Sequence, residues 1–109
     1  MSDQATKKVC LVIGVGDGVG AAIAKAFALD GFETVITRRA RNLPDLEAIA
    51  QKIRDQGGVV HARGVDARSE EETVALFQEI ERDIGPIEVM VFNIGANVRF
   101  AIEATTARV

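Results

Sequence analysis

The sequence of 109 residues contains no tyrosine and no tryptophan, and it has a single cysteine and a single histidine. The missing tyrosine excludes a mechanism that uses a phenol as acid or base, and the two absences together exclude a stacking platform of phenol or indole rings. One cysteine and one histidine also exclude a disulfide framework and a zinc site built from these two residue types.

Long apolar runs are also missing near the start of the chain. The first such run, Val9 to Ile13, is too short for a signal peptide or a membrane span. We therefore expect no membrane partner and a cytoplasmic location. Thirteen basic against sixteen acidic side chains give a net charge of −3, which does not favour nucleic acid as a partner.

Two kinds of segment alternate after residues 1–7, which we expect to form a flexible leader. Short β-branched runs predict strands at 9–13, 34–37, 59–65 and 87–92, and helical periodicity follows each of them, ending in a segment at 101–109. Strands that alternate with helices at this spacing form parallel sheets with right-handed crossovers. The prediction is an α/β fold, a partial doubly wound parallel sheet of the Rossmann type with helices on both faces.

The helical segments carry recognisable ends and apolar faces. In the first, 19–29, the expected buried stripe contains Ala22, Ile23, Ala26 and Phe27, and Gly31 suits the left-handed position after its end. Pro44 fits the first turn of the second helix. For the third helix, Ser69 and Glu72 form a capping-box signature, and the expected buried stripe is Val74, Phe77, Ile80 and Ile84.

A glycine-rich loop lies between the first strand and the first helix. Gly14, Gly18 and Gly20 follow a G-x-x-x-G-x-G spacing, whereas Val19 breaks the G-x-G-x-x-G spacing. Bare backbone at a helix N-terminus lets a phosphate approach N–H groups closely, so this position favours a nucleotide site over a plain turn.

Three features together resemble the N-terminal part of the short-chain dehydrogenase/reductase family. The glycine loop is the first, the Phe92-Asn93-Ile94-Gly95 segment resembles the family's Asn-Asn-Ala-Gly motif, and Asp66 matches an acidic position that contacts adenine in the family. The family's usual Thr before the first glycine is Ile13 in this chain. The resemblance spans Val9 to Val109 and implies these cofactor-binding residues: Gly14, Gly18, Val19, Gly20, Arg38, Arg39, Asp66, Asn93 and Gly95.

The residues after the second strand bear on the choice of cofactor. An NAD site of this type expects a carboxylate there, but the chain reads Thr37-Arg38-Arg39-Ala40-Arg41. Arginine suits a 2′-phosphate, so NADP is favoured over NAD. Asp17 argues in the other direction, because NADP-preferring relatives often have a basic residue just before the second glycine. A solvated loop is the alternative interpretation for Arg39 and Arg41.

The resemblance implies an oxidoreductase that moves hydride between a nicotinamide and a carbonyl or alcohol substrate. The family's catalytic Ser, Tyr and Lys lie beyond the point where this chain ends, so residues 8–109 are expected to be a dinucleotide-binding domain truncated before the catalytic segment and inactive alone. His61 has no evident carboxylate partner, and Cys10 is interpreted as a buried hydrophobe.

The expected strand order 3-2-1-4 leaves the apolar fourth strand, Ile87 to Phe92, at an edge, which favours a homo-oligomer formed through that edge. Two other functions stay open. One is a non-catalytic nucleotide-sensing or interaction module built from the same half-fold. The other, ranked lower, is an S-adenosylmethionine-binding domain of the methyltransferase type, because Gly14, Gly16 and Gly18 also give G-x-G-x-G.

Overall fold

The computed structural model describes residues 8–15 and 18–93. The expectations for the leader 1–7, for Gly95 and for a helix at 101–109 lie outside these residues. Strands and helices alternate in the predicted order: β1 (Val9–Ile13), α1 (Val19–Leu29), β2 (Glu33–Arg38), a 3-10 helix (Ala40–Asn42), α2 (Leu43–Asp55), β3 (Val59–Gly64), α3 (Glu70–Asp83) and β4 (Ile87–Phe92).

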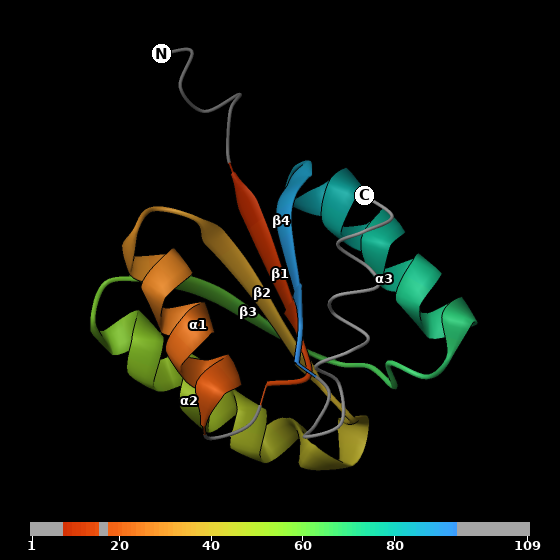
Figure 1. The fold of residues 1–109 in the computed structure, drawn as a ribbon, viewed down its shortest axis with the longest axis horizontal. Coiled ribbons are helices and arrows are strands. Elements are labelled where there is room, and N and C mark those ends of the chain that lie inside the picture. Colours follow the sequence, from red (N-terminus) through yellow and green to blue (C-terminus); the bar gives the residue numbers. More distant parts are fainter. Residues whose placement is uncertain (1–7, 16–17, 94–109) are drawn as a thin grey trace.

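The described strands form one parallel sheet with the order β3-β2-β1-β4, as the sequence predicts. In this register Ile13 lies opposite Thr37 on one side and Phe92 on the other, so these strands end at the same level. The carboxyl ends of β1, β2, β3 and β4 therefore lie at the same end of the sheet (Figure 1). This end is where doubly wound sheets bind their ligands.

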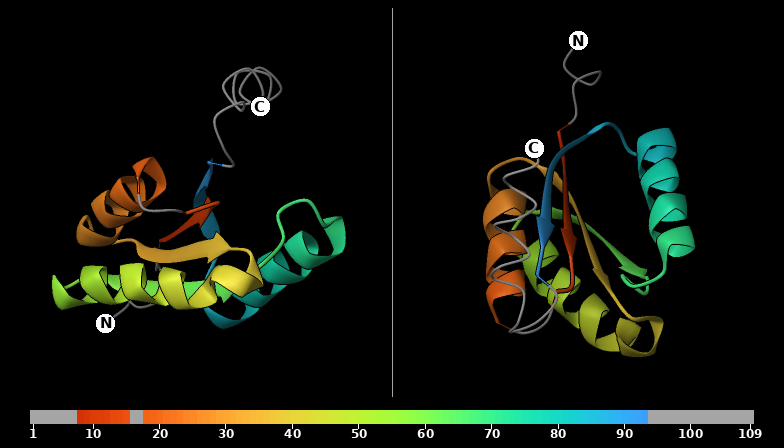
Figure 2. Two further views of the ribbon diagram at one scale, coloured as in Figure 1. Left: turned by 90° about the horizontal axis from the view of Figure 1, so that it is seen from below. Right: turned by 45° about the vertical axis from the view of Figure 1, so that its right-hand side comes forward.

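Helices cover both faces of the sheet, which confirms the layered architecture. Helices α1 and α2 lie on one face and α3 lies on the other (Figure 2). Successive residues of a strand point to opposite faces, so β1 contributes Cys10 and Val12 to the α1–α2 side and Val9, Leu11 and Ile13 to the α3 side. All five residues of β1 are buried, as expected for a central strand between two helical layers.

The buried faces of two helices differ from the predicted stripes. In α1 the buried residues are Gly20, Ala24 and Ala28, whereas Ala22 and Ala26 are exposed. The predicted stripe was right for Ile23 and Phe27, which pack against the core, and wrong for the two alanines. The buried residues are small and four apart, so the helix lies close to the sheet. In α3, Val74 is exposed and Leu76 is buried together with Ile80.

The end of β3 lies very close to the 3-10 helix. A Cβ atom at Gly64 would lie 2.8 Å from Cα of Ala40, and the N–H of Val65 donates to the carbonyl of Arg38 at 2.7 Å. Gly64, the last residue of β3, therefore allows the β2–α2 connection to lie against the sheet. Within the described residues, no helix combines the length and the apolar character needed to cross a membrane.

Candidate functional site

The glycine loop after β1 is anchored to the end of β2. The carbonyl of Thr37 accepts hydrogen bonds from the N–H groups of Gly14 at 3.2 Å and Val15 at 2.8 Å. The buried Thr37 hydroxyl also accepts from the Gly14 N–H at 3.3 Å. Gly14 has a φ of +88°, a conformation that favours glycine, so the chain turns sharply here between strand and helix.

Helix α1 begins directly after this loop, and no described side chain caps its N-terminus. Its N-cap residue, Gly18, offers no side chain, and the first turn contains no acidic residue. The first N–H groups of a helix have no partner within the helix, and the helix dipole places partial positive charge there. Within the described residues, α1 thus presents free donors toward the strand ends.

The two described glycines at this helix start differ in their surroundings. A Cβ at Gly18 would meet nothing within 4 Å, which leaves open space beside the loop. A Cβ at Gly20 would lie 2.7 Å from Nδ2 of Asn93, 3.1 Å from Cα of Val15 and 3.2 Å from the carbonyl oxygen of Gly14. Gly20 therefore permits close packing of helix on loop, and Gly18 keeps the space in front of the helix clear.

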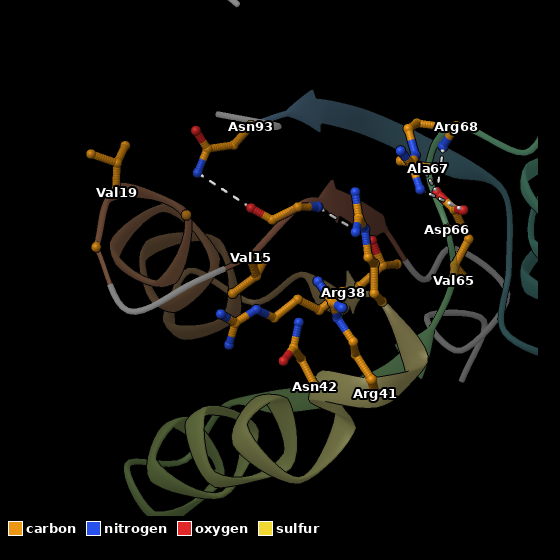
Figure 3. A pocket seen from close by; sticks show the side chains of 15 residues that line it. Val15, Val19, Arg38, Arg41, Asn42, Val65, Asp66, Ala67, Arg68 and Asn93 are labelled. Carbon is orange, nitrogen blue, oxygen red and sulfur yellow. Dashed lines mark hydrogen bonds and ion pairs between the residues drawn. The ribbon is translucent and has the colours of Figure 1, made fainter. Parts of the chain in front are cut away.

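Asn93 ties the end of β4 to the same loop. Its backbone N–H donates to the carbonyl of Ile13 at 2.8 Å, and its side-chain amide donates to the carbonyl of Gly14 at 3.4 Å. The side chain of Asn93 thus holds the carbonyl of Gly14, while Thr37 holds its N–H (Figure 3).

Arginines gather at the carboxyl end of β2. Arg38 ends the strand, and Arg39 and Arg41 follow in the connection to α2 (Figure 3). No hydrogen bond or ion pair engages these three guanidinium groups from anywhere in the described ranges 8–15 and 18–93. By contrast, Arg54, Arg63 and Arg82 all have acidic or carbonyl partners elsewhere on the surface.

Asp66, just after β3, supplies a carboxylate at the same end of the sheet. Its Oδ1 accepts from the backbone N–H of Arg68 at 3.0 Å and from Nε of Arg68 at 3.2 Å, while Oδ2 accepts from Nη2 at 3.4 Å. The hydrogen bonds from Arg68 hold the pKa of Asp66 below its ordinary value of 3.8, and the charge of Arg39 acts in the same direction. The carboxylate is therefore ionised at neutral pH.

The glycine-loop cleft is the space that these groups enclose, with a volume of about 540 Å³. Eight of the nine predicted cofactor-binding residues line it, and the ninth, Gly95, lies outside the described residues. Its described lining contains four arginines and one carboxylate, which makes it strongly cationic. The lining residues are Gly14, Val15, Gly18, Val19, Gly20, Thr37, Arg38, Arg39, Arg41, Asn42, Val65, Asp66, Ala67, Arg68 and Asn93.

The sequence analysis considered Arg41 only as a member of the basic segment after β2, and it did not consider Asn42 or Arg68. Each lies within a few residues of the carboxyl end of a strand, and that proximity was the available signal. The periodicity of α2 and α3 drew attention to their apolar faces instead of to the turns that precede them.

The remaining reactive side chains lie away from the cleft. His61 is paired with Glu33 through Nε2 and Oε2 at 2.8 Å, so the expectation that it has no carboxylate partner was wrong. Cys10 is fully buried, and burial raises the pKa of its thiol to about 11, in agreement with a small core residue. Groups of three or more potential metal ligands do not occur in the part of the chain described here.

Helix α3 begins close to the cleft but is capped internally. The hydroxyl of Ser69 accepts from the N–H of Glu72 at 3.2 Å, as the capping-box signature predicts. The return contact differs from the prediction, because the Glu72 carboxylate accepts from the N–H of Asp66 at 2.8 Å, while the N–H of Ser69 donates to the carbonyl of Asp66. The cap thus also fixes the turn that carries Asp66.

Comparison with known sequences agrees with the family resemblance of the glycine loop, Asp66 and Asn93. The profile of the short chain dehydrogenase family matches residues 8–109. An uncharacterized oxidoreductase of Mycobacterium tuberculosis is 30% identical over 112 aligned residues, which cover 100% of this chain and 32% of that protein. The chain therefore spans about a third of the length of the curated relatives it matches.

Comparison with solved structures extends this result to the fold. A short-chain dehydrogenase from Rhodopseudomonas palustris superposes with a TM-score of 0.75 at 42% identity, covering 93% of this chain and 46% of that one. A metagenomic short-chain oxidoreductase in complex with NADP gives a TM-score of 0.76 at 28% identity, covering 82% of this chain and 39% of that one. Sequence, strand order and the loop after β1 lead to one conclusion: the chain belongs to the short-chain dehydrogenase family.

Proposed function

We propose that residues 8–109 are the NADP-binding part of an oxidoreductase that transfers hydride between a nicotinamide and a carbonyl or alcohol group. The observation that carries the proposal is the group of three arginines, Arg38, Arg39 and Arg41, that have no partner among the described residues and lie in one cleft with the glycine start of α1. When bound, the dinucleotide would supply the hydride, and this chain's residues would hold and orient its adenosine end.

The described residues fit such a ligand on chemical grounds. The free N–H groups of α1 suit a pyrophosphate, and the open space at Gly18 allows it to approach the backbone. The arginines suit the 2′-phosphate, because guanidinium donors match phosphate oxygens in pairs. Asp66 is an acceptor that suits the amino group of adenine.

The choice of NADP over NAD is tested by calorimetric titration of the chain with both nucleotides. We expect NADP to bind at least about tenfold more tightly, since a hydrogen bond to a charged group contributes about 1.5–3 kcal/mol. Arg38→Ala and Arg39→Ala should lower the affinity for NADP about tenfold and leave the affinity for NAD nearly unchanged.

A matched control removes an arginine from another surface. Arg82 is paired with Asp83 at the end of α3, so Arg82→Ala should leave both affinities unchanged. Tighter binding of NAD than NADP by the parent chain would refute the choice of cofactor. Binding of S-adenosylmethionine with no binding of either dinucleotide would refute the proposal as a whole.

We further infer that the 109-residue chain does not complete hydride transfer. It contains no tyrosine, which is one of the three catalytic residues that the family resemblance implies. Incubation with NADPH and a panel of aldehydes and ketones should therefore give no oxidation of the nucleotide above background. Sustained carbonyl reduction by the purified chain would contradict this inference.

We also propose that two copies associate through the edge strand β4. In the described sheet β4 has a hydrogen-bonded neighbour on one side only, and Met90 on this strand is 45% exposed. An apolar edge strand favours pairing with another copy, and a lysine placed there disfavours it. In light scattering, Met90→Lys should shift the chain toward monomer, whereas Val74→Lys, at an equally exposed position on α3, should not. A parent chain that is monomeric at every concentration would count against the association.

A further inference from the structure

The contacts between Asp66 and Arg68 leave the two oxygens of the carboxylate in different states. Oδ1 accepts two hydrogen bonds, from the backbone N–H and from Nε of Arg68, at 3.0 and 3.2 Å. Oδ2 has only the longer contact, 3.4 Å, to Nη2. Each carboxylate oxygen has about two acceptor positions, so Oδ1 is saturated and Oδ2 retains capacity for another donor.

The backbone of this turn is fixed as firmly as the side chain. The N–H of Asp66 donates to the Glu72 carboxylate at 2.8 Å, and its carbonyl accepts from the N–H of Ser69 at 2.9 Å. Both bonds lead to the capped first turn of α3. The position of Asp66 is thus set by α3, and the rotation of its carboxylate is set by Arg68 (Figure 3).

We propose that Arg68 is a positioning residue that makes Asp66 a reader of the purine base: it occupies Oδ1 and so presents Oδ2 alone to the ligand. An ionised carboxylate accepts hydrogen bonds and cannot donate them. The Asp66 carboxylate therefore favours a purine that presents an amino group to it, such as adenine, and disfavours a purine that presents a carbonyl group in the same place. This inference rests on the proposed binding of NADP in the cleft.

A second arginine, Arg82, forms a similar ion pair away from the cleft. It allows the positioning role of Arg68 to be distinguished from a general effect of removing one positive charge. Arg82 contacts the Asp83 carboxylate with the same two nitrogens, Nε at 3.0 Å and Nη2 at 3.1 Å, and both arginine side chains are 70% exposed. The Arg82 pair lies at the other end of α3 and does not line the cleft. Arg82→Ala is therefore a matched control for Arg68→Ala.

The experiment compares NADP with nicotinamide hypoxanthine dinucleotide phosphate, which differs in having a carbonyl in place of the amino group. We measure both affinities by calorimetry for the parent chain and for Arg68→Ala, Arg68→Lys and Arg82→Ala. The parent and Arg82→Ala should prefer NADP by about tenfold or more, the selectivity expected of a hydrogen bond to a charged group. Arg68→Ala should lower this preference to about threefold or less.

Arg68→Lys keeps the positive charge but lacks the planar pair of donors. It should therefore lose the preference as Arg68→Ala does, while keeping more of the total affinity for both ligands. Because the preference is a ratio measured on one protein, a partly unfolded variant does not change it.

The possible failures are distinguishable. If the parent binds neither nucleotide, the proposed function and this inference both fall. If the parent binds NADP but does not prefer it over the hypoxanthine analogue, or if both Arg68 variants keep the parent's preference, the role of Arg68 is refuted and NADP binding stands.

Discussion

Gly20 is the position where the fold and the cleft depend most directly on one missing side chain. A methyl group there would lie 2.7 Å from the Asn93 amide nitrogen, 3.1 Å from Cα of Val15 and 3.2 Å from the Gly14 carbonyl oxygen. All three distances are shorter than ordinary van der Waals contact, which begins at 3.4 Å. Gly20→Ala must therefore displace the Asn93 side chain and press helix α1 away from the glycine loop.

The change in the free energy of unfolding caused by Gly20→Ala follows from two opposing contributions. Overpacking of a well-packed site costs about 1–3 kcal/mol, and alanine recovers up to about 1 kcal/mol of helix propensity relative to glycine. We expect the free energy of unfolding to fall by about 1–2 kcal/mol. For a domain of this size the melting temperature would fall by about 4–10 °C.

The assay is urea denaturation monitored by circular dichroism. Two further variants separate the contributions. Ala26→Gly, at an exposed position of the same helix, measures the propensity contribution alone. Asn93→Ala in the Gly20→Ala background removes the side-chain conflict but leaves the two backbone conflicts, so it should restore only part of the loss. A Gly20→Ala chain as stable as the parent would refute the close packing of α1 on the loop.

Four other predictions concern capping, burial, the pH dependence of stability and the charge of the ligand. Ser69→Ala removes the acceptor for the Glu72 N–H and should lower the free energy of unfolding by about 1 kcal/mol in urea denaturation; an unchanged midpoint would contradict the cap. Cys10 should resist alkylation at pH 8 unless denaturant is added, and prompt labelling of the native chain would contradict its burial. Because folding raises the Cys10 pKa from 9.0 to about 11, its contribution to stability should be complete below pH 9 and decline as the pH rises toward 11. The ratio of NADP to NAD affinity should decrease as the pH is lowered from about 7.5 to 5.5, because a phosphate monoester loses one of its two charges near pH 6. Asp66, whose pKa is lowered, stays ionised over this range. A constant ratio would argue against contact between the arginines and the 2′-phosphate.

The location of the cleft followed from the sequence because it depends on topology. Gly14, Arg38, Asp66 and Asn93 each come directly after a predicted strand, and the carboxyl ends of parallel strands meet at one edge of a sheet. That inference needs only the order of the elements, which the alternation of β-branched and helical segments provides. It does not need the rotation of any side chain.

The features that escaped prediction depend on contacts between distant segments. His61 meets Glu33 because β2 and β3 pair with Val35 opposite His61, and no local pattern specifies that register. The buried face of α1 was misassigned because Ala24 and Ala28 gain their burial from the closeness of the sheet and not from their own size.

Two of the helices that begin near the cleft, α1 and α3, differ in how the N–H groups at their starts are treated. The start of α3 has a Ser69 cap that accepts from the N–H of Glu72, and three glutamates in its first turn complement the helix dipole. The start of α1 has a glycine at the cap and no acidic residue in its first turn. An anion from outside would compete with carboxylates at α3, whereas at α1 it would meet N–H donors that no described residue satisfies. Of these two helices, α1 is therefore the one that fits the proposed phosphate, and α3 holds the turn that carries Asp66.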